Sequence, residues 1–237
     1  NTDEGIEIIT WNCEFFPAAN DSTINSLSEI VKDIDADIIA FQEIKKAGWF
    51  EKLMSRLPDY NYVISLQASF MDLAIIYKKD QFNFISHTEL FSDNDYNFAG
   101  RPPLKLDLKH IKSNTVFSVI NLHMKCCDSG LKRRQKASKM LYDYIIDYDL
   151  HDNFIVLGDW NDDLKDKEED NQILQHIYTE HSPEFIEKIK SIEITPTFGP
   201  WRQKVTLIAD DAARPEPNHG SIATGQSHTI NCEQLAN

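Results

Sequence analysis

Apolar residues along the chain follow two spacings, one typical of strands and one typical of helices. Short apolar runs at 6–11 and 37–41 predict buried strands, and each run ends in polar residues. Between them, apolar residues at 24–34 recur at helical spacing and predict an amphipathic helix. A second helix at 50–57 is expected to end before Pro58, because the residue before a proline disfavours the helical conformation.

The middle of the chain predicts a series of short strands with polar breaks between them. These strands cover 60–66, 73–77, 82–86, 104–108 and 115–122. Their connections are too short for crossovers, which favours antiparallel pairing of neighbouring strands. A long helix at 131–147 and a buried strand at 154–157 follow, and 170–190 predicts helix in two pieces.

The order of these elements predicts an α+β fold. Helices near both ends, with many strands between them, favour sheets that pack face to face with helices outside. The 237 residues lie within the range of one large domain, so 1–237 is expected to form a single domain. Residues 209–237 carry several Pro and Gly and few apolar clusters, which predicts an atypical and poorly ordered tail.

Net charge and hydropathy narrow the class of protein. The formal net charge is −14, so the chain is expected to repel nucleic acid and anionic membranes on average. This counts against a binding module that depends on phosphate contacts, and less against a hydrolase, because a divalent metal supplies local positive charge. No apolar run approaches the ~20 residues of a membrane-spanning helix. The chain begins at Asn1 rather than Met, which fits a trimmed chain or a mature form after signal cleavage, and we expect a secreted or periplasmic protein.

The four cysteines predict neither a disulfide scaffold nor a zinc ribbon. Small disulfide-stabilised domains carry many more cysteines per residue, and the sequence holds no Cys-x-x-Cys pair. Cys126 and Cys127 are adjacent, and a bond between neighbouring cysteines is expected to be strained. Pairing of either residue with a distant cysteine stays open.

Polar residues that suit metal-assisted phosphate chemistry follow four apolar runs. They occur in Trp11-Asn12, Gln42-Glu43, Asn121-Leu122-His123 and Gly158-Asp159-Trp160-Asn161. Strand ends in sheet-based folds are where side chains converge on one pocket. Each motif alone also fits an ordinary structural role, such as a solvated glutamate, a turn-forming asparagine, a histidine that caps a strand, or an Asx turn.

The chemistry of these residue types favours a functional role. The Glu43 carboxylate suits a hard cation such as Mg²⁺, and Asn12 offers both a donor and an acceptor to the water shell of the metal or to a phosphate oxygen. His123 can donate a proton or a hydrogen bond near neutral pH. Asp159 and Asn161 are two residues apart, so both side chains can face one pocket in extended chain.

In this order, the four motifs resemble the endonuclease/exonuclease/phosphatase superfamily over roughly residues 5–165. The resemblance implies a four-layered α/β sandwich of two mainly antiparallel sheets, with the active site at one edge of the sheets. It implies a hydrolase in which Glu43 and Asn12 bind Mg²⁺, with Mn²⁺ or Ca²⁺ as alternatives. Asp159 would orient or deprotonate the attacking water, while His123 and Asn161 would bind the phosphate.

Arg101 and a basic segment are further candidates. Arg101, in Gly100-Arg101-Pro102, resembles a family arginine before a strand and is expected to contact phosphate, with a surface arginine as the alternative. Residues 125–139 concentrate Lys and Arg in an otherwise acidic chain. They would attract a polyanionic substrate, or they would form a solvated helix face.

The C-terminal part departs from the family pattern. A Ser-Asp-His group, whose histidine acts as a base or transition-state partner, is expected there and does not occur in clean form. His228, which follows Gln226-Ser227, or His219 would have to fill this role. Otherwise the chain is altered beyond about residue 200, or it keeps the fold with lost or reduced activity, because losing one of several cooperating residues is costly.

The preferred hypothesis is a Mg²⁺-dependent nuclease that cleaves phosphodiester bonds of DNA or RNA with a water molecule. The chain lacks long insertions for a lipid or inositol headgroup. A sphingomyelinase-like or other small-molecule phosphodiesterase or phosphatase is the alternative within enzymes. A non-catalytic binding protein on the same fold is the alternative outside them, and the atypical tail favours it.

Overall fold

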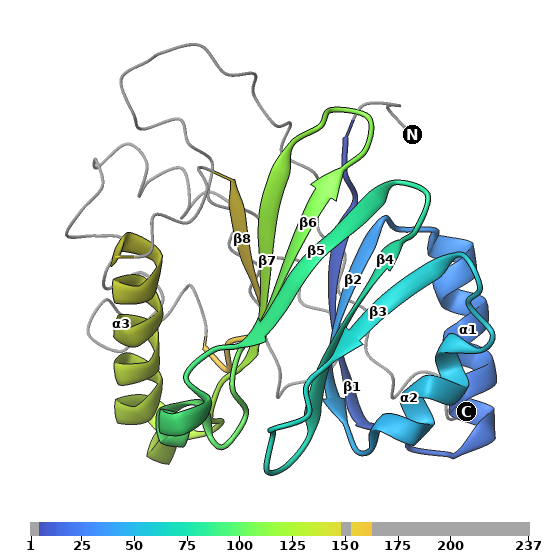
Figure 1. Ribbon diagram of the computed structural model, residues 1–237. Coiled ribbons are helices and arrows are strands. Elements are labelled where there is room, and N and C mark those ends of the chain that lie inside the picture. Colours follow the sequence, from blue (N-terminus) through green and yellow to red (C-terminus); the bar gives the residue numbers. More distant parts are fainter. Residues whose placement is uncertain (1–4, 148–152, 163–237) are drawn as a thin grey trace, which may run out of the picture.

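Two four-stranded sheets lie face to face in the computed structural model, which describes residues 5–147 and 153–162 (Figure 1). The strand order is β1-β2-β4-β3 in one sheet and β5-β6-β7-β8 in the other. The strands are β1 (Ile8–Phe16), β2 (Ile38–Ile44), β3 (Tyr60–Ile64), β4 (Asp72–Lys78), β5 (Phe82–Glu89), β6 (Leu104–His110), β7 (Val116–His123) and β8 (Phe154–Asp159). The predictions for 170–190 and 209–237, including His219 and His228, lie outside the described residues.

Pairing within each sheet is mainly antiparallel. β2 and β3 both pair with β4 in antiparallel fashion, as β5 and β7 do with β6. Among the described strands, the parallel pairs are β1 with β2 and β7 with β8. A parallel pair needs a crossover, and α1 (Asp21–Ile34) and α3 (Leu131–Asp147) supply the two crossovers. The fold class expected from the sequence is therefore confirmed.

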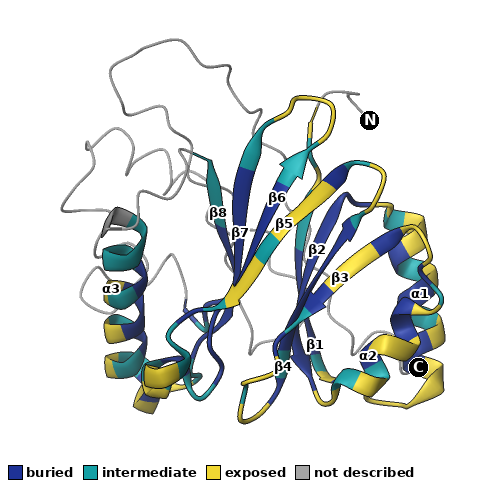
Figure 2. Ribbon diagram, viewed as in Figure 1, coloured by how far each residue is buried: buried dark blue, intermediate teal, exposed yellow. Residues whose placement is uncertain are grey.

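Three apolar cores separate four layers of secondary structure. Successive residues of β2 point to opposite faces, so Ile38 and Ala40 enter the core between the sheets while Ile39 and Phe41 face the helices. The helices on that outer face are α1 and α2 (Ala47–Met54). On the far side of the other sheet, Ile120 packs in the core that also holds residues of α3. Figure 2 shows that inner strands such as β2 and β7 are almost wholly buried, whereas the edge strands β3 and β5 carry many exposed residues.

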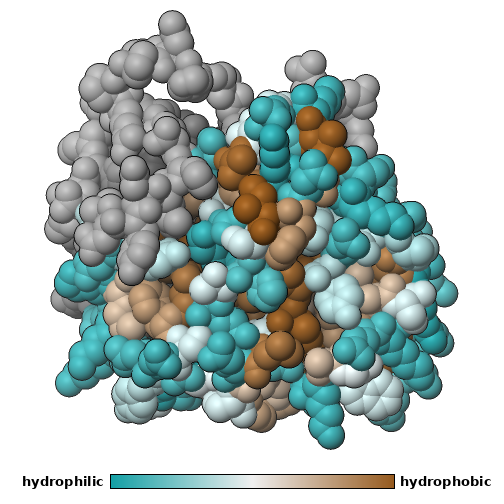
Figure 3. All heavy atoms as spheres, viewed as in Figure 1, coloured by the Kyte–Doolittle hydropathy of each residue, from teal (hydrophilic) through white to brown (hydrophobic). Residues whose placement is uncertain are grey.

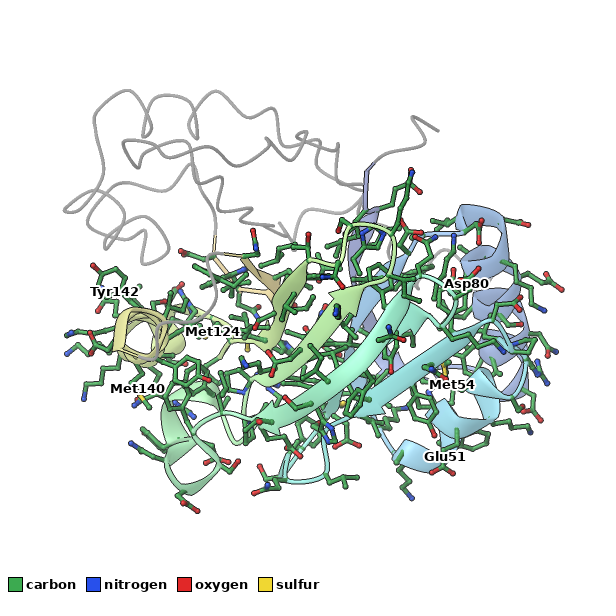
Figure 4. The ribbon with its side chains drawn as sticks, turned by 45° about the horizontal axis from the view of Figure 1, so that its top comes forward. Glu51, Met54, Asp80, Met124, Met140 and Tyr142 are labelled. Atoms are coloured by element: carbon green, nitrogen blue, oxygen red, sulfur yellow. The ribbon has the colours of Figure 1, made fainter. Side chains whose placement is uncertain are left out.

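The loop after β7 is anchored beneath α3. Met124 follows the last residue of β7 and is fully buried in the outer core with Ala137 and Leu141 of α3. Figure 4 shows Met124 between α3 and the sheet, with Met140 and Tyr142 on the helix beyond it. This contact fixes the chain directly after His123, and therefore the end of β7.

The face of the molecule that Figure 3 shows is mainly hydrophilic where the structure is described. Figure 3 shows one face, on which apolar groups form a narrow strip among hydrophilic ones. β5 is an edge strand of its sheet, and its exposed side chains include Phe84 and Ile85. Within residues 5–147 and 153–162, no helix is long and apolar enough to cross a membrane.

Candidate metal and catalytic site

Three ionisable side chains from both sheets converge at the carboxyl ends of β2, β7 and β8. Glu43, His123 and Asp159 each offer a possible ligand atom, and these atoms lie within 4.8 Å of one another. His123 Nε2 lies 3.7 Å from Glu43 Oε1 and 3.6 Å from Asp159 Oδ2. All three residues are buried. The strand pairing explains the meeting of two of them, because His123 and Asp159 are register partners at the ends of parallel strands.

Asn12 connects the carboxylates of Glu43 and Asp159 through hydrogen bonds. Its Nδ2 donates hydrogen bonds to Glu43 Oε1 at 2.9 Å and to Asp159 Oδ2 at 2.7 Å. Its Oδ1 accepts a hydrogen bond from the backbone N–H of Glu14 at 2.8 Å, which sets the orientation of the amide. Asn12 is fully buried. It therefore holds the relative position of Glu43 and Asp159, a role that the sequence motif alone did not indicate.

The backbone around Glu43 departs from regular strand geometry. Glu43 has a φ of 64°, and the pairing of β2 with both neighbours shifts register near this residue. Glu14 and Phe15, opposite on β1, also have positive φ angles, and the Phe15 N–H donates to Glu43 Oε2 at 3.0 Å. Positive φ in non-glycine residues costs of order 1–3 kcal/mol and concentrates at functional sites. The irregularity turns the Glu43 carboxylate towards the cluster rather than into a core.

The motif at the end of β8 forms a turn and supports the site at the same time. The backbone N–H of Asn161 donates to Asp159 Oδ1 at 3.0 Å, which is the Asx-turn contact. The Asn161 Nδ2 donates to the carbonyl of Met124 at 3.1 Å. The structural and functional interpretations of this motif are thus compatible, because one Asp159 oxygen closes the turn while the other faces Asn12.

Gly158 is required by the close approach of β7 and β8. It has a φ of 140°, and a Cβ at this position would lie 2.0 Å from the backbone oxygen of Leu122. No side chain fits there, so a glycine before Asp159 allows the two strand ends to meet. This accounts for the first residue of the Gly158-Asp159-Trp160-Asn161 motif.

Arg101 lies behind His123 and is buried, with 8% of its surface exposed, so it is not the surface arginine considered as the alternative. Its Nε donates to the carbonyl of His123 at 3.2 Å, and its Nη2 donates to the carbonyl of Met124 at 2.9 Å. Burial lowers the pKa of the guanidinium, while the carboxylates of Asp159 and Glu43 act in the opposite direction. Its side chain therefore fixes the turn after His123 and adds positive charge near the two carboxylates.

A second polar network ties the sheets together beneath the cluster. Gln42 Nε2 donates to Asn121 Oδ1 at 2.7 Å, and Asn121 Nδ2 donates to the carbonyls of Phe41 at 2.9 Å and Ala74 at 3.1 Å. Gln42 also contacts Thr10 Oγ1 at 3.0 Å. Gln42 and Asn121 belong to the sequence motifs. Only their closeness in the chain to Glu43 and His123 could have indicated that they connect the two sheets.

The basic segment is partly structural. Arg134 Nη1 donates to the carbonyls of Lys125 at 3.0 Å and Cys127 at 2.8 Å. Arg133 hydrogen-bonds the carbonyl of Tyr96 and lies 4.2 Å from the centre of its ring. Lys139 pairs with Asp143 on the same helix. Substrate attraction by this segment stays a prediction for its other cations.

The donor set at the strand ends fits a divalent cation. Glu43 and Asp159 offer carboxylate oxygens, which hard cations prefer, and His123 adds a ring nitrogen. The buried carboxylates of Glu43 and Asp159 both accept a hydrogen bond from the Asn12 amide and repel each other when both are ionised. A cation at the cluster would offset that repulsion. Glu43 and Asp159, with His123 beside them, are the residues that would hold the ion.

Known structures share this arrangement of elements. A humanised TDP2 of D. rerio gives a TM-score of 0.59 at 17% identity, covering 73% of this chain and 70% of that one. The human nocturnin catalytic domain with bound sulfate gives 0.58 at 15%, covering 74% and 69%. The mannosyl-6-phosphatase Bt3783 of Bacteroides thetaiotaomicron gives 0.56 at 16%, covering 74% and 71%. At these identities, the likeness establishes the fold.

The family is established by the sequence itself. A comparison with curated protein sequences found no match. The model of the endonuclease/exonuclease/phosphatase family matches residues 9–202, which is most of the chain and includes all four strand-end motifs. The resemblance stated from those motifs is therefore confirmed, and this chain belongs to the endonuclease/exonuclease/phosphatase family.

Proposed function

We propose that this protein is a Mg²⁺-dependent phosphodiesterase that cleaves DNA or RNA with an activated water molecule. The observation that carries the proposal is the convergence of Glu43, His123 and Asp159 within 4.8 Å, from three strands of two sheets. Carboxylates and an imidazole held this closely, at low exposure, are typical of metal-assisted hydrolysis. Family membership supports the same reaction class.

The side chains divide the work of hydrolysis. Asp159 accepts the proton of the attacking water as its oxygen bonds to phosphorus, and the ester P–O bond on the opposite side breaks. His123 and Asn161 donate hydrogen bonds to non-bridging phosphate oxygens, where negative charge develops. A divalent cation held chiefly by Glu43, next to Asp159, would supply positive charge that stabilises the transition state. Asn12 keeps both carboxylates in place through its two hydrogen bonds.

Nucleic acid is the proposed substrate class. A structure of D. rerio TDP2 with this fold holds a single strand DNA product, at a TM-score of 0.58. Arg101 is buried next to His123, and its charge is felt by Asp159 and Glu43, so one fixed cation lies near the site in an otherwise acidic chain. The net charge of −14 favours small contacts with a few phosphates over broad backbone binding.

A phosphatase for small sugar phosphates is the second candidate. The same net charge of −14 disfavours a long polyanion, and the mannosyl-6-phosphatase of Bacteroides thetaiotaomicron shares the fold at a TM-score of 0.56. A non-catalytic binding protein is less well supported, because a binding module does not need two buried carboxylates and a histidine that converge at one place.

Hydrolysis assays with matched variants test the proposal. The substrates are plasmid DNA, single-stranded DNA and RNA, bis(p-nitrophenyl) phosphate, p-nitrophenyl phosphate and a hexose 6-phosphate, each with Mg²⁺ or with EDTA. We expect metal-dependent cleavage of the nucleic acids and the diester. We also expect a loss of at least about 10²-fold in His123→Ala and Glu43→Gln, as when one transition-state donor is removed. Glu51→Gln, on the exposed side of α2, is the control and should keep full activity.

Two other outcomes would redirect the assignment. Cleavage of the monoesters alone would replace the nuclease by a phosphatase. A folded protein that binds Mg²⁺ in calorimetry but cleaves nothing with any divalent metal would favour the non-catalytic alternative.

A further inference from the structure

Two adjacent cysteines lie in the loop that follows the site histidine, and both are reachable from solvent. Cys127 is exposed and Cys126 is partly exposed, three residues beyond His123. Cys127 Sγ donates a hydrogen bond to Cys126 Sγ at 2.8 Å. Neither residue has a role in the proposed phosphoester chemistry.

The backbone brings the two sulfur atoms together. Side chains of neighbouring residues in extended chain point in opposite directions, so adjacent sulfur atoms meet only where the backbone deviates. Cys127 supplies the deviation with a φ of 69° and a ψ of 168°. Glycine would adopt this conformation with less strain. A cysteine at this position is therefore not explained by the turn alone.

Buried groups hold the loop in this shape on both sides of the pair. The carbonyl of Cys127 accepts hydrogen bonds from Arg134 Nη1 and from the Gly130 N–H, each at 2.8 Å. Arg134 Nη1 also binds the carbonyl of Lys125, and Arg101 Nη2 binds that of Met124. The two thiols are thus kept in contact by the fold, so little conformational entropy remains to be lost when they react.

Cations around the pair favour the thiolate of Cys126. Lys125 Nζ lies 3.4 Å from Cys126 Sγ. The hydrogen bond from Cys127 lowers the pKa of the Cys126 thiol most strongly, and Lys125 and Arg101 lower it further, while burial acts against them. The same hydrogen bond raises the pKa of Cys127. Lys125 and Arg101 place positive charge near Cys126, which disfavours a metal cation at this sulfur and favours its reactive thiolate form.

We propose that Cys126 and Cys127 form a dithiol that reacts with hydrogen peroxide and closes reversibly to a disulfide between the two residues. The Cys126 thiolate attacks one oxygen of the peroxide, the O–O bond breaks, and the other oxygen leaves as water after taking up a proton. Cys127 sulfur then attacks the Cys126 sulfenic acid, the S–O bond breaks, and its oxygen leaves as water with the Cys127 proton. Two thiols are oxidised by two electrons and one peroxide is reduced to two waters.

The geometry of neighbouring residues makes this bond readily reversible. Adjacent Cα atoms across a trans peptide lie about 3.8 Å apart, whereas unstrained disulfides separate their Cα atoms by roughly 4.4–6.8 Å. The strain expected from the sequence is therefore present, and it makes the disulfide easy to reduce by a small thiol rather than preventing its formation. Strained and exposed disulfides are the labile ones.

Peptide mapping of the reduced protein tests the proposal, and it requires no enzymatic activity. The protein is exposed to stoichiometric hydrogen peroxide, alkylated under denaturing conditions and digested with trypsin. We expect peptide 126–132 to lose two hydrogen atoms and both alkylation sites together, and dithiothreitol should restore both. Cys13→Ser, which removes a buried thiol of β1, is the matched control and should leave this result unchanged.

The two single variants separate the roles of the sulfurs. Cys127→Ser should stop at the Cys126 sulfenic acid, which a dimedone reagent captures, whereas Cys126→Ser should give no capture at Cys127. A disulfide from Cys126 to Cys232 would overturn the proposal. Oxidation of Cys126 to sulfinic acid while Cys127 stays free for alkylation would also overturn it.

Discussion

The amide of Asn12 lies 2.7 Å from the carboxylate of Asp159, a hydrogen bond between two residues 147 positions apart in the chain. The same amide nitrogen lies 2.9 Å from Glu43 Oε1. Two strands of different sheets are therefore connected at the site by one neutral side chain. This contact sets the distance between the carboxylates before any cation binds, which is how a fold preorganises a metal site.

Replacing Asn12 should damage the site without unfolding the protein. Asn12→Ala removes both hydrogen bonds, so Glu43 and Asp159 are left to repel each other. We expect kcat/KM with Mg²⁺ to fall by about 10²-fold or more, as for loss of one preorganised donor, and Mg²⁺ affinity to fall in calorimetry. Asn83→Ala, on an exposed position of β5, is the control. An Asn12→Ala protein with unchanged metal affinity would contradict the bridging role.

Replacing Arg101 should lower both the stability of the protein and its activity, and a lysine should restore these only in part. A guanidinium reaches the carbonyls of His123 and Met124 together, whereas a single ammonium does not match this fork. We expect Arg101→Ala to lower the free energy of unfolding by about 1–3 kcal/mol for each carbonyl left unsatisfied, and to lower kcat because His123 loses its support. Urea denaturation and kinetics measure the two effects. Equal stability of Arg101→Ala and wild type would refute the anchoring role.

Gly158 should tolerate no side chain. Gly158→Ala places a Cβ against the Leu122 backbone oxygen and forces a φ of 140° on a non-glycine residue. Strain of that kind costs of order 1–3 kcal/mol before the clash is counted. Thermal denaturation should show the loss. Gly48→Ala is a matched control, because its new Cβ meets nothing within 4 Å and helix α2 gains about 0.5–1 kcal/mol.

Asp107 should stabilise the protein in a pH-dependent way, far from the site. Burial acts to raise the pKa of Asp107, but hydrogen bonds from Lys105, Ser118 and Ser86 outweigh it and lower the pKa below the usual value. A lowered folded-state pKa means that the stabilisation is complete above the unfolded pKa and is lost as pH falls through the folded pKa.

Urea denaturation of Asp107→Asn measures this effect. At neutral pH the variant leaves the Lys105 cation without its carboxylate, and we expect a loss of about 3–5 kcal/mol. The difference from wild type should shrink as pH falls below about 4, the ordinary range of an aspartate. Asp93→Asn, on an exposed position, should show no such difference. A difference that stays constant with pH would refute the assignment.

The sequence was sufficient to predict the fold and the convergence of the site, because apolar spacing marks strands and polar residues mark their ends. Glu43, His123 and Asp159 each follow an apolar run, so their meeting followed from the architecture. The bridging by Asn12 and the backbone contacts of Arg101 could not be predicted. They depend on which atoms face each other across the sheets, and spacing along the chain carries no information about that.

The contact of the two cysteines was also beyond prediction from the sequence. Adjacent residues are neighbours in any fold, but their sulfur atoms meet only because of the φ angle at Cys127 and the carbonyl contacts of Arg134. The expectation of strain was a statement about bond geometry, and it did not address reactivity.

Each sheet is built from one uninterrupted stretch of chain, and the chain passes from one sheet to the other at Lys79-Asp80-Gln81, between β4 and β5. Figure 4 labels Asp80 at this junction. Asn12 and Glu43 therefore belong to one half of the described molecule, and His123 and Asp159 to the other. A cation bound at the cluster would contact both halves. The affinity of the protein for the cation and the free energy of association of the two halves would therefore depend on each other. Conditions that weaken the packing between the two halves would release the ion. Without the ion, the two halves would move more freely relative to each other than with the ion bound.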